Sequence, residues 1–332
     1  KECICPYCQA ITAGHFPNHI QAPTQYGSTI KAVCVVMSVN YKIPLAKIVQ
    51  LMEDLYKIRI NESSIINWLK QSYNLMKPTE DQVKEHLLNS KLVHADETGV
   101  NINGKNYWNH VVSTDKLTHQ FINEKRGQKE IRSEASILPY YKGILVHDCW
   151  SSYFTLEQVK HEICGAHLIR ELNALIEDCK SKWAFRFQKY LLELHNSPIA
   201  KNKKNKKQIL LDYNKILRQG IHEEPPPRRT SYRGRIKNSK GLNLINRLIK
   251  YKESVLGFAF SNLIPFTNNQ AERDIRHCKT KQKVAGCFRS LEGAKYYMRI
   301  SSITITLRKN SVNVLDWIKS LFAEGIFTLP LT

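Results

Sequence analysis

Three carboxylates of this 332-residue chain stand where they could do chemistry. Asp96 follows the apolar start of "KLVHADETGV", and Asp148 follows the apolar run of "GILVHDCW". Each is therefore predicted to end a core strand, where α/β sheets commonly hold catalytic groups. Glu272 heads the basic stretch "NNQAERDIRHCKTKQKVAGC" on a predicted helix. If the two strands are neighbours, their carboxylates converge, and Glu272 could join them from across the sheet.

Such a trio predicts a site for divalent cations. Carboxylates held together repel one another, and Mg²⁺ relieves the repulsion because it prefers oxygen ligands. Two such ions can activate an attacking oxygen and stabilise the departing one in phosphodiester transfer. A purely structural interpretation is also open, in which Asp96 caps a turn, Asp148 starts a helix and Glu272 pairs with Arg276 at i+4.

The charge of the chain indicates a polyanionic partner, with nucleic acid first. There are 50 Lys and Arg against 29 Asp and Glu, for a net charge of +21, which bears on partners and not on fold. Between Lys180 and Lys252 we count 20 basic and four acidic residues. The basic residues after Glu272 most simply contact DNA phosphates, although a charge run can also be a solvated face. They are Arg273, Arg276, Lys279, Lys281, Lys283 and Arg289, with Lys201–Lys207 and Arg228–Arg235 as weaker candidates.

Cysteine usage and hydropathy predict a cytoplasmic protein. The nine cysteines are scattered and odd in number, which fits reduced thiols better than a disulfide framework. No apolar run is long enough for a membrane helix, and no signal-peptide pattern is present. We therefore expect no membrane partner.

Cys5 and Cys8 have the spacing of a zinc half-site, and tetrahedral zinc needs four ligands. The chain opens without Met, so a second ligand pair could precede Lys1. Candidates within the chain are Cys3, His15, His19 and Cys34. The alternative is a pair of buried thiols.

Residues 1–27 form this partial zinc-knuckle segment, and residues 28–90 are predicted to be helical. Apolar residues return every three or four positions up to Met76, which fits three helices. The stretch from Ile43 to Leu75 resembles a DNA-binding helix-turn-helix, with Asn61 as N-cap. Its inward-facing residues would be Ile65, Ile66 and Leu69. A plain helical bundle fits the same pattern.

Residues 91–182 are predicted to form the first part of an α/β core. "KLVHADETGVNI", "KNYWNHVVST" and "LTHQFINEK" are β-rich runs separated by turn signals, which predicts an antiparallel meander. A helical run, "GQKEIRSEASILPYY", then precedes the buried strand of "GILVHDCW", and "KHEICGAHLIREL" predicts a strand leading into a helix. Strand alternation turns Glu97 away from Asp96, so Asp96 is the candidate.

The rest of the chain is predicted to be mainly helical. Residues 183–261 form a basic helical insertion, residues 262–310 a second core part carrying Glu272, and residues 311–332 a helical tail. A helix should begin near Asn268. "EGAKYYMRISSITITLRKN" fits a closing helix, although its Ile/Thr run favours strand.

Several stretches together resemble the DDE transposases of the insertion-sequence 66 family. "HADETGV", "LVHDCWSSY", "ICGAHLIREL" and "IPFTNNQAERDIRHCKTKQKVAGCFRS" occur in the family's order, with a helical insertion before the last one. That long motif is the most specific. "CPYCQ", "GHFP" and "QYGSTIKA" resemble the family's zinc-knuckle exit and the start of its helical region, so the likeness covers nearly the whole chain.

The resemblance implies an α/β fold with an RNase H-like mixed sheet core, an N-terminal helical region and an α-helical insertion. Asp96, Asp148 and Glu272 would then bind two Mg²⁺ or Mn²⁺ ions for DNA cleavage and strand transfer. The implied partners are double-stranded DNA at transposon ends and target, further copies of the chain, and other proteins encoded by the element. The implied location is the bacterial cytoplasm, in association with the nucleoid.

Two features qualify the resemblance. Family members usually carry a complete four-ligand knuckle, whereas only Cys5 and Cys8 stand in register here. Cys164 and His167 match a Cys-x-x-His signature of several DDE families, and they either steady the active-site helix or bind metal. Two other functions stay open, namely a DNA-binding accessory or domesticated protein without the reaction, and an RNase H-like structure-specific nuclease.

Overall fold

The computed structural model describes residues 2–13, 25–197, 205–227 and 237–325. Its centre is a five-stranded mixed sheet in the order β5-β4-β3-β6-β7. The strands are β3 (Leu92–Ile102), β4 (Lys105–Ser113), β5 (Thr118–Asn123), β6 (Ile144–His147) and β7 (Lys160–Ile163). The pairs β3–β4 and β4–β5 are antiparallel, whereas β3–β6 and β6–β7 are parallel. This is the predicted RNase H-like α/β arrangement. Of the predicted residues, His15, His19, Lys201–Lys204 and Arg228–Arg235 lie outside the described ranges.

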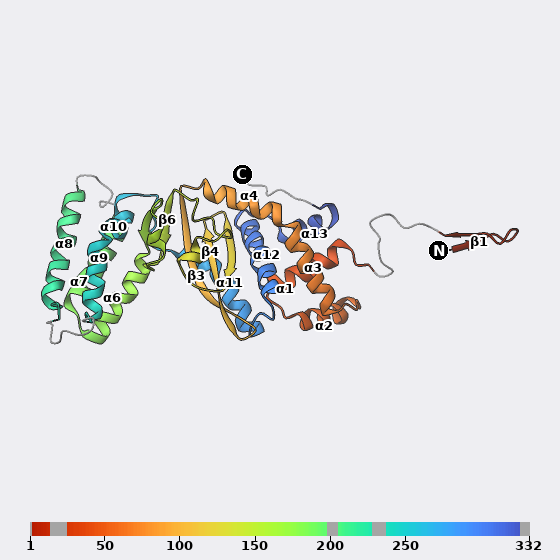
Figure 1. Cartoon of the computed structure of the whole chain (residues 1–332), viewed down its shortest axis with the longest axis horizontal. Helices are drawn as coiled ribbons and strands as arrows, with labels where there is room; N and C mark the ends of the chain where they lie inside the picture. The colour runs from red at the N-terminus through yellow and green to blue at the C-terminus, as the bar shows by residue number, and fades with distance from the viewer. Residues whose placement is uncertain (1, 14–24, 198–204, 228–236, 326–332) are drawn as a thin grey trace.

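Helices pack on the sheet (Figure 1). On one side of it, their buried side chains extend the hydrophobic core of the sheet. Helix α11 (Asn269–Ala285) packs on β3 and β4, and α12 (Leu291–Lys309) packs on β5. The N-terminal helices are α1 (Ser28–Val39), α2 (Leu45–Tyr56), α3 (Glu62–Leu75) and α4 (Lys77–Leu88), and the last described helix is α13 (Val314–Glu324). Their buried side chains belong to the same hydrophobic cluster as those of the sheet. The N-terminal helices are therefore packed into the core and are not a separate module.

The insertion has a hydrophobic core of its own on the opposite side of the sheet (Figure 1). It contains α7 (Lys182–Asn196), α8 (Lys206–Glu223), α9 (Lys240–Lys250) and α10 (Lys252–Phe260). Helix α6 (Gly165–Cys179) starts directly after β7 and contributes buried leucines to this second cluster. One helix thus connects the central sheet to the insertion. No described helix is both long and apolar enough to cross a bilayer.

Two local predictions need correction. The run from Gly127 to Tyr141 forms only one helical turn, α5 (Gln128–Ile131), because its apolar residues pack on the core from turns that lead to Pro139. Ile66 is 47% exposed, whereas Ile65, as predicted, and Trp68 are the buried residues of that turn. Asn61 is the N-cap residue of α3, as predicted, although its side chain makes no capping hydrogen bond.

The ambiguous segment before Asn310 is helix α12. Its first turn is capped by Ser290, whose hydroxyl accepts a hydrogen bond from the Gly293 N–H. The Ile/Thr run is buried against the sheet and the N-terminal helices. Burial of the whole segment therefore outweighs the preference of β-branched residues for strands.

Candidate active site

Asp96 and Asp148 lie just beyond the paired part of two neighbouring strands. The last β3–β6 pair joins His94 to Val146, and each aspartate lies two residues further along the chain. Asp148 directly follows β6, as predicted. Asp96 does not end a strand, because β3 continues to Ile102 in pairing with β4. The condition set from the sequence, that the two strands be neighbours, is met in the sheet order, although Asp96 lies inside a longer strand.

The electrostatics of Asp96 link all three predicted carboxylates. Burial raises the pKa of Asp96 to about 7, helped by the negative charges of Glu97, Asp148 and Glu272. The Glu97 N–H donates to Asp96 Oδ1 at 2.9 Å and opposes the shift. Like charges in a poorly solvated region disfavour ionisation. The carboxylates therefore share one region, and Asp96 has no cation as hydrogen-bond partner among the described residues.

Glu97, the next residue along β3, has a set of strong partners. Arg126 donates to Glu97 Oε1 from Nε at 2.9 Å and from Nη2 at 2.5 Å. The Tyr153 hydroxyl donates to Oε2 at 2.5 Å. Burial and the charge of Asp148 raise the pKa of Glu97, and Tyr153 and Arg126 oppose that shift. A carboxylate with these bonds suits a structural role.

Arg126 also contacts the second aspartate. Its guanidinium lies 4.3 Å from the centre of the Trp150 ring and 5.1 Å from that of Trp108. Its Nη2 is 3.9 Å from Asp148 Oδ2. Asp148 Oδ1 accepts a hydrogen bond from the Trp150 N–H at 2.9 Å. Sequence reasoning missed Arg126, because no spacing in the chain relates it to residues brought close only by the fold.

Glu272 lies in the first turn of α11, and basic side chains surround its carboxylate. Arg170 Nη2 is 3.2 Å from Oε1, and His167 Nδ1 is 3.7 Å from the same oxygen. Arg276, one turn along α11, has Nη2 at 3.8 Å from Oε2. The i+4 pair considered from the sequence is therefore present. The closer partner is Arg170 of α6, which the sequence did not reveal.

The start of α11 is bonded to both the sheet and α6. The Asn268 side chain donates to the Ala95 carbonyl at 2.7 Å, and its Oδ1 lies 2.9 Å from His94 Nδ1. The Asn268 N–H donates to Cys164 Sγ at 3.1 Å. These bonds fix Glu272 relative to the strand that carries Asp96 and to the helix that carries Arg170.

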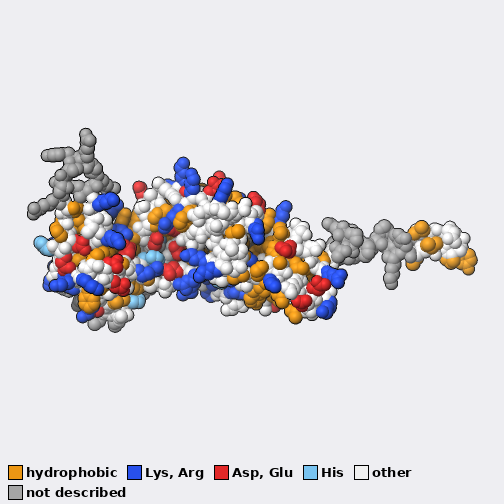
Figure 2. Space-filling view, turned by 90° about the horizontal axis from the view of Figure 1, so that it is seen from below, with side chains coloured by type: hydrophobic (Ala, Val, Ile, Leu, Met, Phe, Trp, Pro, Cys, Tyr) orange, Lys and Arg blue, Asp and Glu red, His pale blue; other side chains and the backbone are white. Residues whose placement is uncertain are grey.

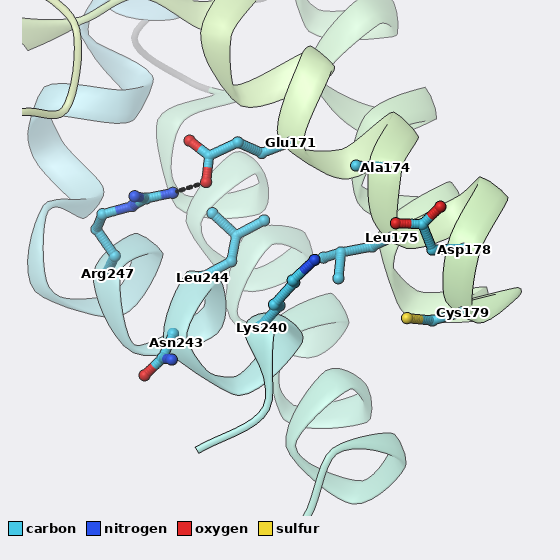
Figure 3. A pocket seen from close by; sticks show the side chains of 9 residues that line it. All are labelled: Glu171, Ala174, Leu175, Asp178, Cys179, Lys240, Asn243, Leu244 and Arg247. Atoms are coloured by element: carbon cyan, nitrogen blue, oxygen red, sulfur yellow. Dashed lines mark hydrogen bonds and ion pairs between the residues drawn. The ribbon is translucent and has the colours of Figure 1, made fainter. Parts of the chain in front are cut away.

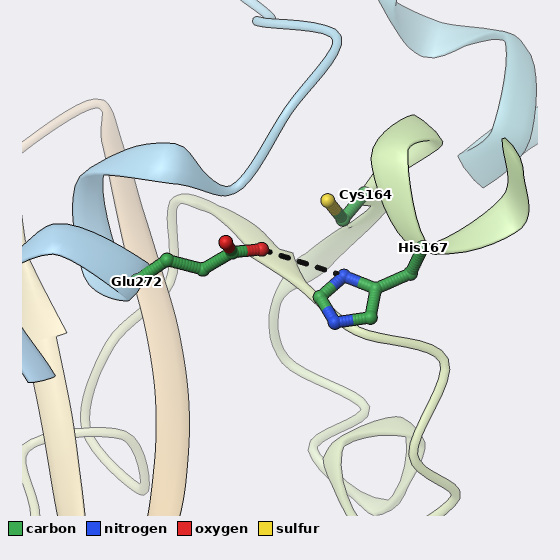
Figure 4. A group of neighbouring side chains, drawn as sticks. All are labelled: Cys164, His167 and Glu272. Atoms are coloured by element: carbon green, nitrogen blue, oxygen red, sulfur yellow. Dashed lines mark ion pairs between the residues drawn. The ribbon is translucent and has the colours of Figure 1, made fainter. Parts of the chain in front are cut away.

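Cys164 and His167 lie beside Glu272 (Figure 4). Cys164 is buried and stands at the N-cap of α6, and burial raises the pKa of its thiol. Burial lowers the pKa of His167. In the described part of the chain, the buried Nδ1 of His167 has no hydrogen-bond partner. The cysteine is buried as expected of a structural residue, but the histidine is not held by a hydrogen bond at Nδ1.

Most of the basic residues near Glu272 face solvent. Figure 2 shows Lys and Arg side chains gathered over the middle of one face. Lys281 differs, because its Nζ donates to the Ser38 carbonyl of α1 at 3.2 Å. Burial and the charge of Lys42 lower the pKa of Lys281 to about 8. The exposed members of the predicted DNA-contacting set are Arg273, Arg276, Lys279, Lys283 and Arg289.

A pocket lies elsewhere, between α6 and α9 (Figure 3). Its volume is about 270 Å³, and an ion pair between Glu171 and Arg247 lies at its rim. None of the predicted site residues lines it. The carboxylate region and this pocket are therefore separate features.

Cys5 and Cys8 lie in the turn between β1 (Glu2–Ile4) and β2 (Ile11–Ala13). The Cys5 N–H donates to the Ala10 carbonyl, and the Gln9 N–H donates to the Cys5 carbonyl, each at 2.9 Å. The backbone N–H groups of Cys8 and then Tyr7 lower the pKa of the Cys5 thiol. Such amide-to-sulfur bonds favour a thiolate, the form that binds zinc.

Comparison with known protein families places this chain in one of them. A family model described as "Transposase IS66 family" matches residues 23–296. The matched range includes all three carboxylates, Cys164, His167 and the exposed basic residues of α11. No curated protein matches the chain.

Proposed function

The chain belongs to the IS66 family of transposases, and we propose that it cuts DNA strands and joins them to new sites by two-metal phosphodiester chemistry. Asp96, Asp148 and Glu272 would hold two Mg²⁺ or Mn²⁺ ions. The observation that carries this proposal is the placement of the three acids: β3 and β6, which lead to Asp96 and Asp148, are neighbouring strands, and the helix that carries Glu272 packs on β3. The negative charges of Asp148 and Glu272 accordingly add to burial in raising the pKa of Asp96.

The donor set suits Mg²⁺. All three groups supply oxygen, the ligand atom that hard cations prefer. Their mutual repulsion is the kind of instability that a bound divalent cation removes. When bound, such a pair of ions would activate the attacking oxygen and stabilise the leaving oxygen.

The residues of the chain would orient these groups. Backbone N–H groups bind one oxygen each of Asp96 and Asp148, from Glu97 and Trp150 respectively. Each aspartate therefore keeps a second oxygen that is free of these backbone bonds. Glu272 differs, because its Oε1 has to leave Arg170 before it can serve as a ligand.

The basic surface of α11 would bind the substrate. Arg273, Arg276, Lys279, Lys283 and Arg289 are exposed on or just after the helix that carries Glu272. Phosphate contacts from these residues would hold double-stranded DNA without reading its sequence. Because two transposon ends must meet a target, we propose that the protein acts as a homo-oligomer, with other proteins of the element as further partners. The bacterial cytoplasm, where DNA is accessible, is the proposed location.

The N-terminal hairpin would supply half of a zinc site. Cys5 and Cys8 present two sulfur ligands from one turn, and tetrahedral zinc takes two more. Zinc content of the purified protein should fall on changing both residues to Ser. Equal zinc content in the two proteins would contradict this assignment.

The test of the main proposal uses Asp148→Asn, which keeps the shape of the side chain and removes its charge. It should reduce Mg²⁺-dependent nicking of DNA carrying the element's ends by at least about 10³-fold, since removal of a metal ligand removes transition-state stabilisation of several kcal/mol. DNA binding should be unchanged. Asp178→Asn, the same change at an exposed position of α6, is the matched control.

Three outcomes would overturn parts of the proposal. Wild-type cleavage by Asp148→Asn would remove this residue from the reaction. Binding by the wild-type chain without any Mg²⁺-dependent cleavage would indicate a DNA-binding accessory protein. Cleavage of junctions or hybrids without joining of 3′-ends would indicate a structure-specific nuclease.

A further inference from the structure

A second set of metal-ligating side chains lies next to the oxygen-rich region. Cys164 Sγ, a ring nitrogen of His167 and a carboxylate oxygen of Glu272 all lie within 4.8 Å of one another (Figure 4). They come from the start of α6 and the start of α11, which the Asn268–Cys164 hydrogen bond holds together. The donors are sulfur, nitrogen and oxygen, in contrast to the all-oxygen set of Asp96, Asp148 and Glu272.

The sulfur atom is held by a backbone donor at the start of a helix. The Asn268 N–H donates to Cys164 Sγ at 3.1 Å, and Cys164 stands at the N-cap of α6. An N–H donor and the N-terminus of a helix both stabilise negative charge on a sulfur atom. Hydrogen bonds of this kind orient metal ligands from the surrounding protein.

The histidine nitrogen is directed to the same point. Its Nδ1 is buried and forms no hydrogen bond within the described residues, although buried ring nitrogens usually have a partner. It lies 3.7 Å from Glu272 Oε1, close to the separation of two ligands on one tetrahedral ion. A bound cation would give this lone pair a partner.

We propose that Cys164, His167 and Glu272 form a binding site for a zinc-class divalent ion, separate from the magnesium pair and sharing only Glu272 with it. Sulfur and imidazole ligands favour Zn²⁺ and Co²⁺ over Mg²⁺. On binding, the Cys164 S–H bond is replaced by a sulfur–metal bond, and the proton passes to solvent. Three protein ligands leave a fourth position for water or a DNA oxygen.

Arg170 is the internal competitor for this site. Its guanidinium lies 3.2 Å from Glu272 Oε1, the oxygen that also faces His167. An incoming ion would displace it, and because the Arg170 side chain is 61% exposed it can swing into solvent. If the proposed function holds, the zinc-class ion and the magnesium pair compete for the same carboxylate, that of Glu272. Zinc should therefore inhibit Mg²⁺-dependent cleavage.

The binding test is a Co²⁺ titration of the full chain carrying Cys5→Ser and Cys8→Ser, which removes the hairpin thiols. We expect a thiolate-to-cobalt charge-transfer band, which reports binding at Cys164 even where Co²⁺ also fills the all-oxygen set. Cys164→Ser should abolish the band, and His167→Gln should weaken binding by more than about tenfold, since loss of even an outer partner costs about 10- to 100-fold. Cys179→Ser, an exposed cysteine of the same helix, is the matched control and should change nothing.

Two arginine variants test the displacement. Arg170→Gln should tighten Co²⁺ binding by about tenfold, because it removes a charged hydrogen bond to the shared oxygen. Arg276→Gln removes the same charge from beside Oε2, where the nearest approach is 3.8 Å, and should have a smaller effect. Equal effects of the two variants on Co²⁺ affinity would show that the net charge around the site governs this affinity. They would contradict a specific displacement of Arg170.

The metal site fails if no thiolate band forms, or if the band survives both Cys164→Ser and His167→Gln. His167→Gln keeps the buried thiol, so it remains informative if Cys164→Ser does not fold, as judged by circular dichroism. A chain that binds Co²⁺ through Cys164 but never cuts DNA would sustain this site while the proposed function fails. A chain that cuts DNA but gives no band would do the reverse.

Discussion

Helix α11 carries two acids, Glu272 and Asp274, which are held very differently. Asp274 is buried, and its Oδ2 accepts hydrogen bonds from Lys309 Nζ at 2.6 Å and from the Thr118 hydroxyl at 2.8 Å. Glu272 has basic side chains around it at 3.2 Å and beyond. The inward side of the helix is thus bonded tightly, whereas the side that faces α6 is held loosely.

The difference shows how a fold can position a metal-binding carboxylate and still leave its oxygens available to a metal ion. Lys309 also donates to the carbonyls of Thr114 and Leu117, at 2.7 and 3.0 Å, so Asp274 is joined to the loop before β5 as well as to α12. Buried and fully bonded groups of this kind hold one geometry. Glu272 is then left in place with partners that it can exchange, which suits an acid that must take up a cation.

Asp274→Ala is expected to have the largest effect, a loss of stability. Removing this carboxylate leaves the buried Lys309 ammonium without its charge partner, and breaking a buried pair in this way costs about 3–5 kcal/mol. The free energy of unfolding, measured by urea denaturation at pH 7, should fall by that amount.

Glu272→Ala is the matched variant on the other side of the helix. It removes an acid whose closest partner, Arg170, is 61% exposed, and exposed pairs contribute about 0–1 kcal/mol. Its unfolding free energy should stay within about 1 kcal/mol of wild type. Equal losses in the two variants would contradict the contrast between the two sides of α11.

The next effect is on the pH dependence of stability. Burial and neighbouring acids raise the pKa of Asp96 from 3.8 to about 7. The folded protein therefore binds more protons than the unfolded chain between pH 4 and 7, and stability falls as pH rises through this window. At about 1.4 kcal/mol per pKa unit, the contribution of Asp96 is up to about 4 kcal/mol.

Asp96→Asn should remove this contribution while Oδ1 still accepts the Glu97 N–H. Urea denaturation at several pH values should show the variant gaining on wild type from pH 4 to pH 7, and Mg²⁺ should stabilise wild type more than the variant. Stability curves that stay parallel across the window would refute the perturbed Asp96.

The central elements could be predicted because local pattern and tertiary environment agree there. Turn signals separate β3, β4 and β5, and the apolar run before Asp148 fits a buried parallel strand. These patterns sufficed to predict the strands that lead to Asp96 and Asp148, whereas the adjacency of the two strands was only a condition, which the sheet order meets. The parallel pairing of β3 and β6 ends at His94 and Val146, two residues before each aspartate, a fact that alternation alone could not supply.

The partners of the carboxylates could not be predicted, because distant segments supply them. Arg126 reaches Glu97 from a loop, and Arg170 reaches Glu272 across 102 residues of sequence. The prediction of a helix leading to Pro139 was wrong for a related reason, since the apolar residues of this segment pack on the core from turns and not from a helix. The spacing of residues in a sequence indicates which face of a helix or strand each residue occupies. It gives no information on contacts between side chains of different elements.

The smallest expected effect separates two lysines of α11 that look alike in the sequence. Lys279 is exposed, whereas Lys281 is partly buried and binds the Ser38 carbonyl at the end of α1. If Lys279 contacts a phosphate, Lys279→Gln should lower the slope of log K against log salt for DNA binding by about 0.9. Fluorescence anisotropy at several salt concentrations measures this slope.

Lys281→Gln should give the opposite pattern. The loss of one hydrogen bond between α11 and α1 should lower the unfolding free energy by about 1 kcal/mol and leave the salt slope unchanged. If Lys281→Gln lowers the slope as Lys279→Gln does, Lys281 must reach DNA after leaving Ser38. The contact between Lys281 and Ser38, assigned to the packing of α11 on α1, would then be replaced by a contact with DNA. The inward side of α11 would in that case exchange its partners as readily as the side that carries Glu272.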